Sequence, residues 1–158
     1  MHENYRRQEQ RMGSLDINTL LDYIKDGSYN EKIFSRNGIL ENAGKNIPQH
    51  QLRKFYSEIL NIRDTISLYK FSKKDEKETP KLLKIKLAMI EPIAFYTKSR
   101  LSKSDYSYQF SEIVEFISKS ISTINSDNNF KTWEEKFERF KQLFQSIIAY
   151  SKPEKRGE

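Results

Sequence analysis

Apolar residues recur alternately three and four positions apart in the segment from residue 46 to residue 70. They are Leu52, Phe55, Ile59, Ile62, Ile66 and Tyr69. At about 100° per residue they form one stripe along an α-helix, whereas a half-buried β-strand would alternate every second residue. Pro48 suits a first helical turn because it has no N–H to lose. The segment therefore predicts a long amphipathic helix over 46–70 whose stripe lies in the core.

Two further series of apolar residues at helical spacing follow towards the C-terminus, and the second again alternates three and four positions apart. The first series is Phe110, Ile113, Val114, Ile117, Ile121 and Ile124, and the second is Phe130, Trp133, Phe137, Phe140, Phe144 and Ile147. The residues 126–129, SDNN, form a turn between the two series and offer helix caps. Such three-four seams favour shallow, nearly antiparallel packing. We therefore expect two further long helices, the last of which ends near Tyr150.

The segment 81–101 has two apolar lines rather than one. One line is Leu82, Ile85, Met89, Ile93 and Tyr96, and the other is Leu83, Leu87, Ile90, Ala94 and Leu101. An apolar arc this wide is typical of a helix contacted on several sides, so we expect this helix in the middle of the bundle. Pro92 removes one hydrogen bond of the helix and should kink it.

The N-terminal third gives weaker patterns. A short helix should begin at Ser14 or Asp16, carry four apolar residues and stop at Gly27. Residues 30–43 fit a helix interrupted by the turn pair Asn37-Gly38. Residues 71–80 are charged and should form an exposed, mobile loop, and residues 102–108 should form a linker.

Together these patterns predict an all-α protein. We expect a compact helical bundle of about four long helices plus one or two short N-terminal helices, since no segment shows strand alternation. A length of 158 residues is close to the commonest domain size. We expect a single domain over 14–152, with flexible tails at 1–13 and 153–158.

Charge and composition narrow the functional classes. The chain has 28 Lys and Arg against 22 Asp and Glu, and this formal charge of +6 favours polyanionic partners. It has no cysteine, which excludes disulfides and thiolate metal sites. No apolar run reaches the length of a signal peptide or the roughly 18 residues of a membrane span. We therefore expect a cytoplasmic protein with no membrane contact.

Residues suited to catalysis are few. The two histidines are His2 and His50, and there is no zinc-protease, phosphate-loop, nucleophile-elbow or di-iron motif. The acidic pairs Asp75-Glu76 and Glu134-Glu135 lie in charged surroundings typical of solvated surface. We expect no catalytic residues, no metal and no cofactor; an enzyme would need a metal site that the sequence does not reveal.

Basic residues beside aromatic ones are more informative. The helix at 46–70 carries a second row, roughly a quarter-turn from its stripe, formed by Gln49, Arg53, Tyr56, Arg63 and Lys70. The helix at 81–101 carries Lys81, Lys84 and Lys98 on its polar edge. Lys86, Arg100 and Lys103 lie near its apolar boundary, with Tyr96 close by. Lys and Arg bind phosphate, and Tyr can stack on a base or bond a 2′-OH. Each of these side chains alone could equally be an ordinary solvated residue.

Three segments in order resemble the small subunit of type III-A CRISPR effector complexes, the Csm small subunit. IPQHQLRKFYSEILNIR (47–63) is similar to that family's helix start with Gln, Arg and an aromatic residue. KLLKIKLAMIEPIAFYTKSR (81–100) resembles its central helix, with Tyr96 and Arg100 at the matching positions, and FERFKQLFQSIIAYSK (137–152) resembles its closing helix. The chain departs from the family at Met89, Ile90 and Pro92, in the middle of the central motif.

The resemblance implies a non-enzymatic helical subunit that stacks in several copies, head to tail, along a ribonucleoprotein. Its neighbours would be the backbone subunit that holds the guide RNA, the large polymerase-nuclease subunit, and target RNA paired to the guide. By matching position, Arg53, Lys54 and Arg100 would contact phosphates of the target strand. Helix geometry adds Gln49, Lys84, Lys86 and Tyr96. The alternative is a helical protein–protein adaptor or regulatory bundle whose basic edge binds an acidic partner.

Overall fold

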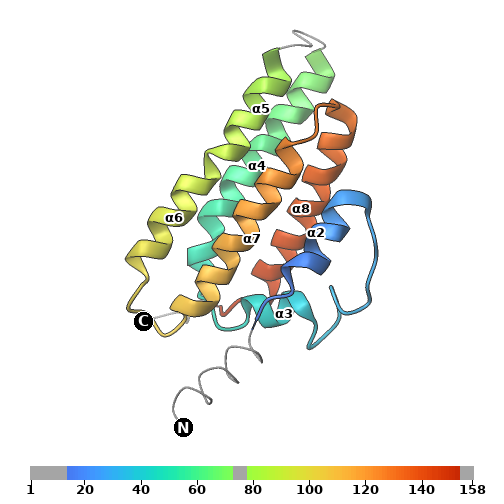
Figure 1. Ribbon diagram of the computed structural model, residues 1–158. Coiled ribbons are helices and arrows are strands. Elements are labelled where there is room, and N and C mark those ends of the chain that lie inside the picture. The colour runs from blue at the N-terminus through green and yellow to red at the C-terminus, as the bar shows by residue number, and fades with distance from the viewer. Residues whose placement is uncertain (1–13, 73–77, 154–158) are drawn as a thin grey trace.

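The computed structural model describes residues 14–72 and 78–153, and these form a bundle of α-helices (Figure 1). Its helices are α2 (Ile17–Asp26), α3 (Ile39–Gly44), α4 (Gln49–Ser72), α5 (Glu78–Ala88), α6 (Ile90–Arg100), α7 (Ser107–Asn125) and α8 (Phe130–Tyr150). The described residues form no β-strand, only an isolated bridge between Pro48 and Lys152. The all-α prediction is confirmed. None of the described helices is long and apolar enough to cross a membrane.

The core lies where α4, α7 and α8 meet. Phe55 of α4 is fully buried, and its ring centroid lies 6.1 Å from that of Phe110 on α7 and 6.4 Å from that of Phe144 on α8. The other side chains of the three predicted stripes are buried around these rings, except for the half-buried Tyr69 and Phe130. The three-four spacing therefore identified the core faces of these helices, as an amphipathic pattern should.

The segment from 78 to 100 forms two helices instead of one kinked helix. Pro92 has no N–H to donate to the carbonyl of Ala88, and its ring crowds that carbonyl. The first helix accordingly ends at Ala88, and α6 begins at Ile90. The helix is therefore interrupted, as predicted. The break lies one turn before Pro92, next to the Ala88 carbonyl that would have accepted the missing hydrogen bond.

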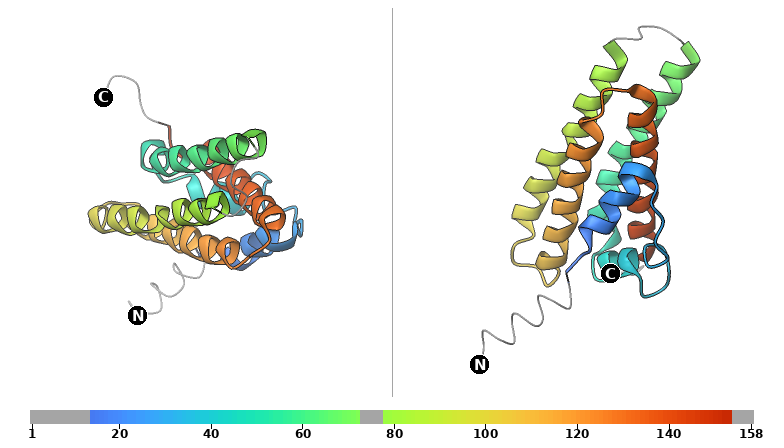
Figure 2. Two further views of the ribbon diagram at one scale, coloured as in Figure 1. Left: turned by 90° about the horizontal axis from the view of Figure 1, so that it is seen from above. Right: turned by 45° about the vertical axis from the view of Figure 1, so that its right-hand side comes forward.

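The expected position of this segment in the middle of the bundle is wrong. One line, Leu83, Leu87, Ile90 and Ala94, is buried, but the other line faces outwards. The exposed fractions are 47% for Leu82, 56% for Ile85, 60% for Met89, 38% for Ile93 and 64% for Tyr96. The two helices run along one edge of the bundle, with α2 on the opposite side (Figures 1 and 2). Periodicity shows that a face is apolar, but it does not show what covers that face.

The N-terminal helix has the predicted boundaries. The Asp16 carboxylate accepts a hydrogen bond from the Thr19 N–H and caps α2, and Gly27 ends it in the left-handed conformation at φ 75°. The expected helix at 30–43 is only partly correct. Residues 31–38 form turns, with Asn37 at φ 59°, and only α3 is helical.

Other boundaries differ by a few residues from those expected. Helix α4 begins just after Pro48, at Gln49, and continues to Ser72, so the expected 71–80 loop is shortened at both ends. The turn before α8 is confirmed, because the Asn129 side chain accepts from the Thr132 N–H, and α8 ends at Tyr150 as predicted. The expected tail at 1–13, all of the expected tail at 153–158 except Pro153, and residues 73–77 of the expected loop lie outside the described residues.

Candidate nucleic-acid interface

The start of α4 and the end of α6 lie at the same end of the bundle (Figure 1). The Gln51 side chain of α4 donates to the Tyr106 hydroxyl just before α7, at 3.5 Å. The chain that leaves α6 is thereby tied to the first turn of α4. This arrangement brings the start of the 47–63 segment to the same end of the bundle as the end of the 81–100 segment, although these residues are almost fifty positions apart in the sequence.

Lys54 on α4 and Arg100 at the end of α6 lie close enough for their charges to interact. Partial burial lowers the pKa of Lys54, and the positive charge of Arg100 lowers this pKa further. The Arg100 guanidinium also lies 5.8 Å from the centroid of the Tyr96 ring, which is cation–π geometry. None of the ion pairs within the described ranges involves Lys54 or Arg100. Two neighbouring cations without a carboxylate form a site that attracts an anion.

Arg53 and Gln49 form a second pair, about 100° further round α4 from Lys54. The Arg53 guanidinium donates to the Gln49 side-chain oxygen. In turn, the Gln49 amide donates to the Ile148 carbonyl at the end of α8, at 3.4 Å. Gln49 therefore positions Arg53 rather than offering free hydrogen bonds of its own. Arg53 remains exposed and forms no ion pair with a carboxylate of the described residues.

Lys84 and Lys86 are not part of this group. Lys84 Nζ donates to the Asn128 side chain at 3.1 Å, in the turn before α8. At 1.5 Å per residue, it stands about 24 Å along the helical edge from Arg100. Lys86 is half-buried on the same stretch of α5. The structure thus brings together Lys54, Tyr96 and Arg100, with Arg53 and Gln49 beside them on α4, and places the other two lysines towards the opposite end.

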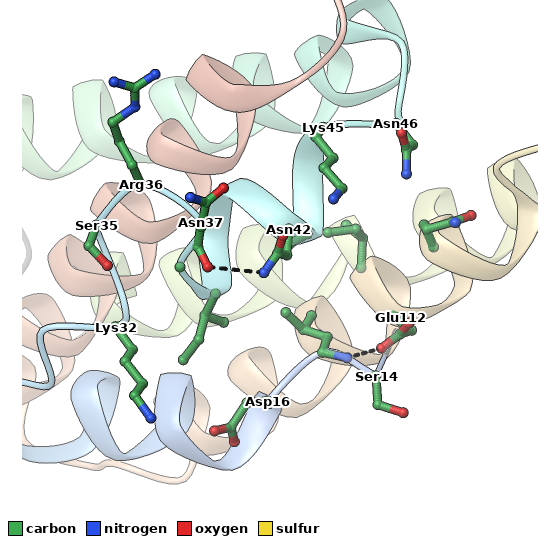
Figure 3. Close-up of a pocket in the computed structure, with 16 residues that line it drawn as sticks. Ser14, Asp16, Lys32, Ser35, Arg36, Asn37, Asn42, Lys45, Asn46 and Glu112 are labelled. Atoms are coloured by element: carbon green, nitrogen blue, oxygen red, sulfur yellow. Dashed lines mark hydrogen bonds between the residues drawn. The ribbon is translucent and has the colours of Figure 1, made fainter. Parts of the chain in front are cut away.

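A second basic group surrounds a cavity of about 680 Å³ between α2, α3 and α7 (Figure 3). Lys32, Arg36 and Lys45 line it together with Asp16 and Glu112. Glu112 accepts a hydrogen bond from the Leu15 N–H, and burial raises the pKa of its carboxyl group. Sequence reasoning missed these cations because they come from turns, where no periodicity marks a face.

Two acidic residues, Glu134 and Glu91, join neighbouring helices. Glu134 pairs with Lys70, and Glu91 accepts a hydrogen bond from the Ser118 hydroxyl, which joins α6 to α7. Among the described residues, no group of three or more His, Asp or Glu side chains could hold a metal ion. The exposed cations of this part of the chain are groups that can bind an anion.

The fold and this surface define a small helical-bundle protein with a cationic end. The profile of the Csm2 Type III-A family matches residues 33–156, and the chain belongs to this family. The family is that of the structural small subunit of the type III-A CRISPR Csm complex. Searches of curated proteins and of solved structures found no match. The resemblance drawn from the three sequence motifs is confirmed.

Proposed function

We propose that this chain is a non-catalytic, RNA-binding structural subunit of a type III-A CRISPR interference complex. Several copies stack along the complex beside the backbone and large polymerase-nuclease subunits. Each copy contacts the backbone of target RNA paired to the guide RNA. The observation that carries the proposal is the Lys54, Arg100 and Tyr96 group, two adjacent cations and an exposed aromatic ring in a member of the Csm2 family.

The chemistry of this group suits a sequence-neutral contact. In a guide-directed complex, base pairing reads the sequence, so a protein beside the duplex needs only to neutralise and position phosphates. Arg100 and Lys54 supply charge, and Arg53, held by Gln49, adds a third cation on the same turn of α4. Tyr96 is 64% exposed and can bond a 2′-OH or stack on a base.

Charge reversal at two positions tests the site. The variant Lys54→Glu/Arg100→Glu should bind RNA more weakly whatever its sequence, and the slope of log affinity against log salt should fall by about 0.7 to 0.9 for each lost phosphate contact. The matched control is Lys25→Glu/Lys131→Glu, which makes the same change in net charge at exposed positions on α2 and α8.

The measurement is RNA binding by the assembled complex over a range of salt concentrations, with circular dichroism as the check on folding. Equal weakening by both double variants would mean that only net charge matters. Unchanged affinity of Lys54→Glu/Arg100→Glu would refute the site assignment. Either result would leave membership of the Csm2 family standing.

A protein–protein adaptor is the second candidate, and the outward-facing apolar line on α5 and α6 favours it. Filter binding at rising salt, with single-stranded RNA compared with an acidic peptide, separates the two functions. Retention of the peptide but not of RNA would support the adaptor.

A further inference from the structure

The cavity between α2, α3 and α7 plays no part in the proposed RNA contact, which uses residues of α4 and α6. Its volume of about 680 Å³ lies within the range of about 300–1,000 Å³ that is usual for small-ligand sites. Apolar side chains form part of its walls, and most of the other lining residues are polar or charged (Figure 3). The apolar residues are Leu15, Ile39, Ala43 and Ile113. This combination is typical of a pocket that holds and orients a small molecule.

The wall that α7 provides contains an unpaired hydrogen-bond acceptor. The side-chain oxygen of Gln109 is buried and receives no hydrogen bond from the described residues. A buried acceptor without a donor costs free energy, so such groups in folded proteins usually have a partner. Glu112 lies one helical turn further along the same face, and it accepts the Leu15 N–H through Oε2, which leaves Oε1 for another donor. This wall therefore suits a ligand that carries N–H donors.

The wall at the end of α3 carries a positive charge. Asn42, Lys45 and Asn46 line the cavity on this side, and Figure 3 shows Lys45 between the two asparagines. Ser14 and Glu112 lie across the cavity from them. None of the ion pairs between described residues involves Lys45. An unpaired ammonium group flanked by two amides can bind a phosphate through charge-assisted hydrogen bonds.

The other charged groups fix which way round a ligand would lie. Both carboxylate oxygens of Asp16 accept hydrogen bonds from Thr19, so Asp16 serves as the cap of α2. Its negative charge and that of Glu112 nevertheless disfavour an anion on their side of the cavity. The Arg36 guanidinium points away from Lys45 in Figure 3. The anionic end of a ligand therefore belongs at Lys45, and its N–H donors belong at α7.

We propose that this cavity binds a nucleotide, with the phosphate at Lys45 and an amino-bearing base at Gln109. Adenine, cytosine and guanine carry an exocyclic amino group, and a base that enters a pocket is usually read along its Watson–Crick edge. Guanine has a ring N–H beside its amino group, so it can donate to both Gln109 and Glu112. Uracil has a single ring N–H between two carbonyl oxygens, which would face the acceptors of α7. We therefore expect GMP to bind more tightly than UMP.

Calorimetric titration of the RNA-free protein tests the ligand class. The probes are GMP, UMP, guanosine and inorganic phosphate. GMP should bind one to one, and each of the other three at least about tenfold more weakly, because each lacks part of the contact. Inorganic phosphate that binds as tightly as GMP would reduce the cavity to an anion site, and binding of none of the four would leave no site. Either result would overturn the inference.

Two variants test the two ends of the cavity. Lys45→Glu should weaken GMP binding at least about tenfold, whereas Lys25→Glu, the same change in charge at an exposed position on α2, should not. Gln109→Leu should also weaken GMP binding, yet its melting temperature should stay level or rise, because the variant removes an unpaired buried acceptor. Equal effects of the two lysine variants would overturn the phosphate position. A less stable Gln109→Leu with unchanged GMP affinity would overturn the base position.

The nucleotide is either free or part of an RNA chain, and RNA binding by the assembled complex distinguishes these sources. If Lys45→Glu weakens only GMP binding, the ligand is a free nucleotide; if it weakens both, the cavity takes a nucleotide of the strand. Weaker RNA binding in a chain that never binds GMP would overturn the inference. Lys54→Glu/Arg100→Glu should bind GMP as the native chain does, so the proposed RNA site can fail without the cavity. Weaker GMP binding by that variant would place the nucleotide at the RNA site instead.

Discussion

Asn125 joins three helices through a single side-chain amide. Its oxygen accepts from the indole N–H of Trp133 on α8 at 2.9 Å, and its nitrogen donates to the Lys84 carbonyl on α5 at 3.0 Å. Trp133 is only 2% exposed, so its N–H has little access to water. A buried donor without an acceptor carries the full cost of its lost hydration.

Replacing this asparagine should therefore destabilise the fold. Asn125→Leu leaves the Trp133 N–H unpaired and should cost about 1–3 kcal/mol in the free energy of unfolding. Urea titration followed by the fluorescence of Trp133, the single tryptophan, measures the change. Asn128→Leu removes only an exposed acceptor for Lys84 and is the control. Equal costs for the two variants would contradict the role of Asn125.

Asp127 makes stability depend on acid pH. Hydrogen bonds from Thr132, Lys136 and the Asn129 N–H lower the pKa of its carboxyl group from 3.8 to about 2. The stabilisation is fully present above the unfolded-state pKa of 3.8 and is lost as the pH falls through about 2. Between pH 5 and 2, the melting temperature should fall further for the native chain than for Asp127→Asn.

The control for this prediction is Asp105→Asn, because Asp105 is exposed and forms no ion pair among the described residues. It should follow the native pH profile throughout. Parallel profiles for the native chain and Asp127→Asn would show that the carboxylate contributes nothing to stability.

At the level of residues, the sequence could nominate basic and aromatic candidates but not sort them. Arg100, Tyr96 and Lys54 were all named, yet their proximity depends on how α4 passes α6. Lys84, a candidate from helix geometry alone, lies elsewhere and donates to Asn128. Gln49 also differs from its expected role, because its amide is engaged with α8. Only the three-dimensional structure shows which of these candidate residues lie together.

Among the elements, α3 is held against α8 by the absence of a side chain at Gly44. A Cβ at this position would overlap the Ile147 carbonyl oxygen and lie 3.3 Å from its carbonyl carbon. The neighbour is backbone within a long helix and cannot turn aside. Glycine is required at few positions within helices, and Gly44 is one of them because the α8 backbone approaches it so closely.

Alanine should therefore be harmful at Gly44, although it favours helix formation elsewhere. Gly44→Ala should cost about 1–3 kcal/mol in the free energy of unfolding because α3 must move away from α8. Ser122→Ala, at an exposed helical position, should change stability by less than about 0.5 kcal/mol. Thermal melts compare the two variants, and a stabilised Gly44→Ala would show that α3 is not tightly packed.

A segment could be predicted as a helix wherever its apolar residues recur three or four positions apart. Helices α4, α7 and α8 satisfy this condition, and Asp16 and Gly27 gave α2 its ends. The turns at 31–38 were not predictable from periodicity, since Gly38 is fixed by the Lys32 and Ser35 carbonyls that crowd it. The edge position of α5 and α6 was missed because both apolar lines looked equally suited to burial.

For the whole molecule, one continuous core links every described helix. Phe55 touches α7 and α8 through Phe110 and Phe144, so no helix pair has a core of its own there. We propose that residues 14–152 form a single cooperative domain. Small single domains usually unfold in one step, with all probes reporting the same transition.

Truncating the central ring tests this cooperativity. Phe55→Ala should cost about 3–5 kcal/mol and lower the melting temperature of all the helices together. Far-ultraviolet circular dichroism and Trp133 fluorescence should give coincident unfolding curves for the native chain and for the variant. Two separate transitions would divide the bundle into independent parts.

The bridge between Pro48 and Lys152 also matters to anyone handling the protein. The Lys152 N–H donates to the Ile47 carbonyl and its carbonyl accepts from the Gln49 N–H, both at 2.9 Å. These two hydrogen bonds hold Lys152, near the end of the described chain, against the start of α4, four residues before Arg53. A truncation that removes Lys152 would loosen that entry. Affinity tags and fluorescent fusions at the C-terminus need a spacer, or they will disturb the very surface they are meant to report.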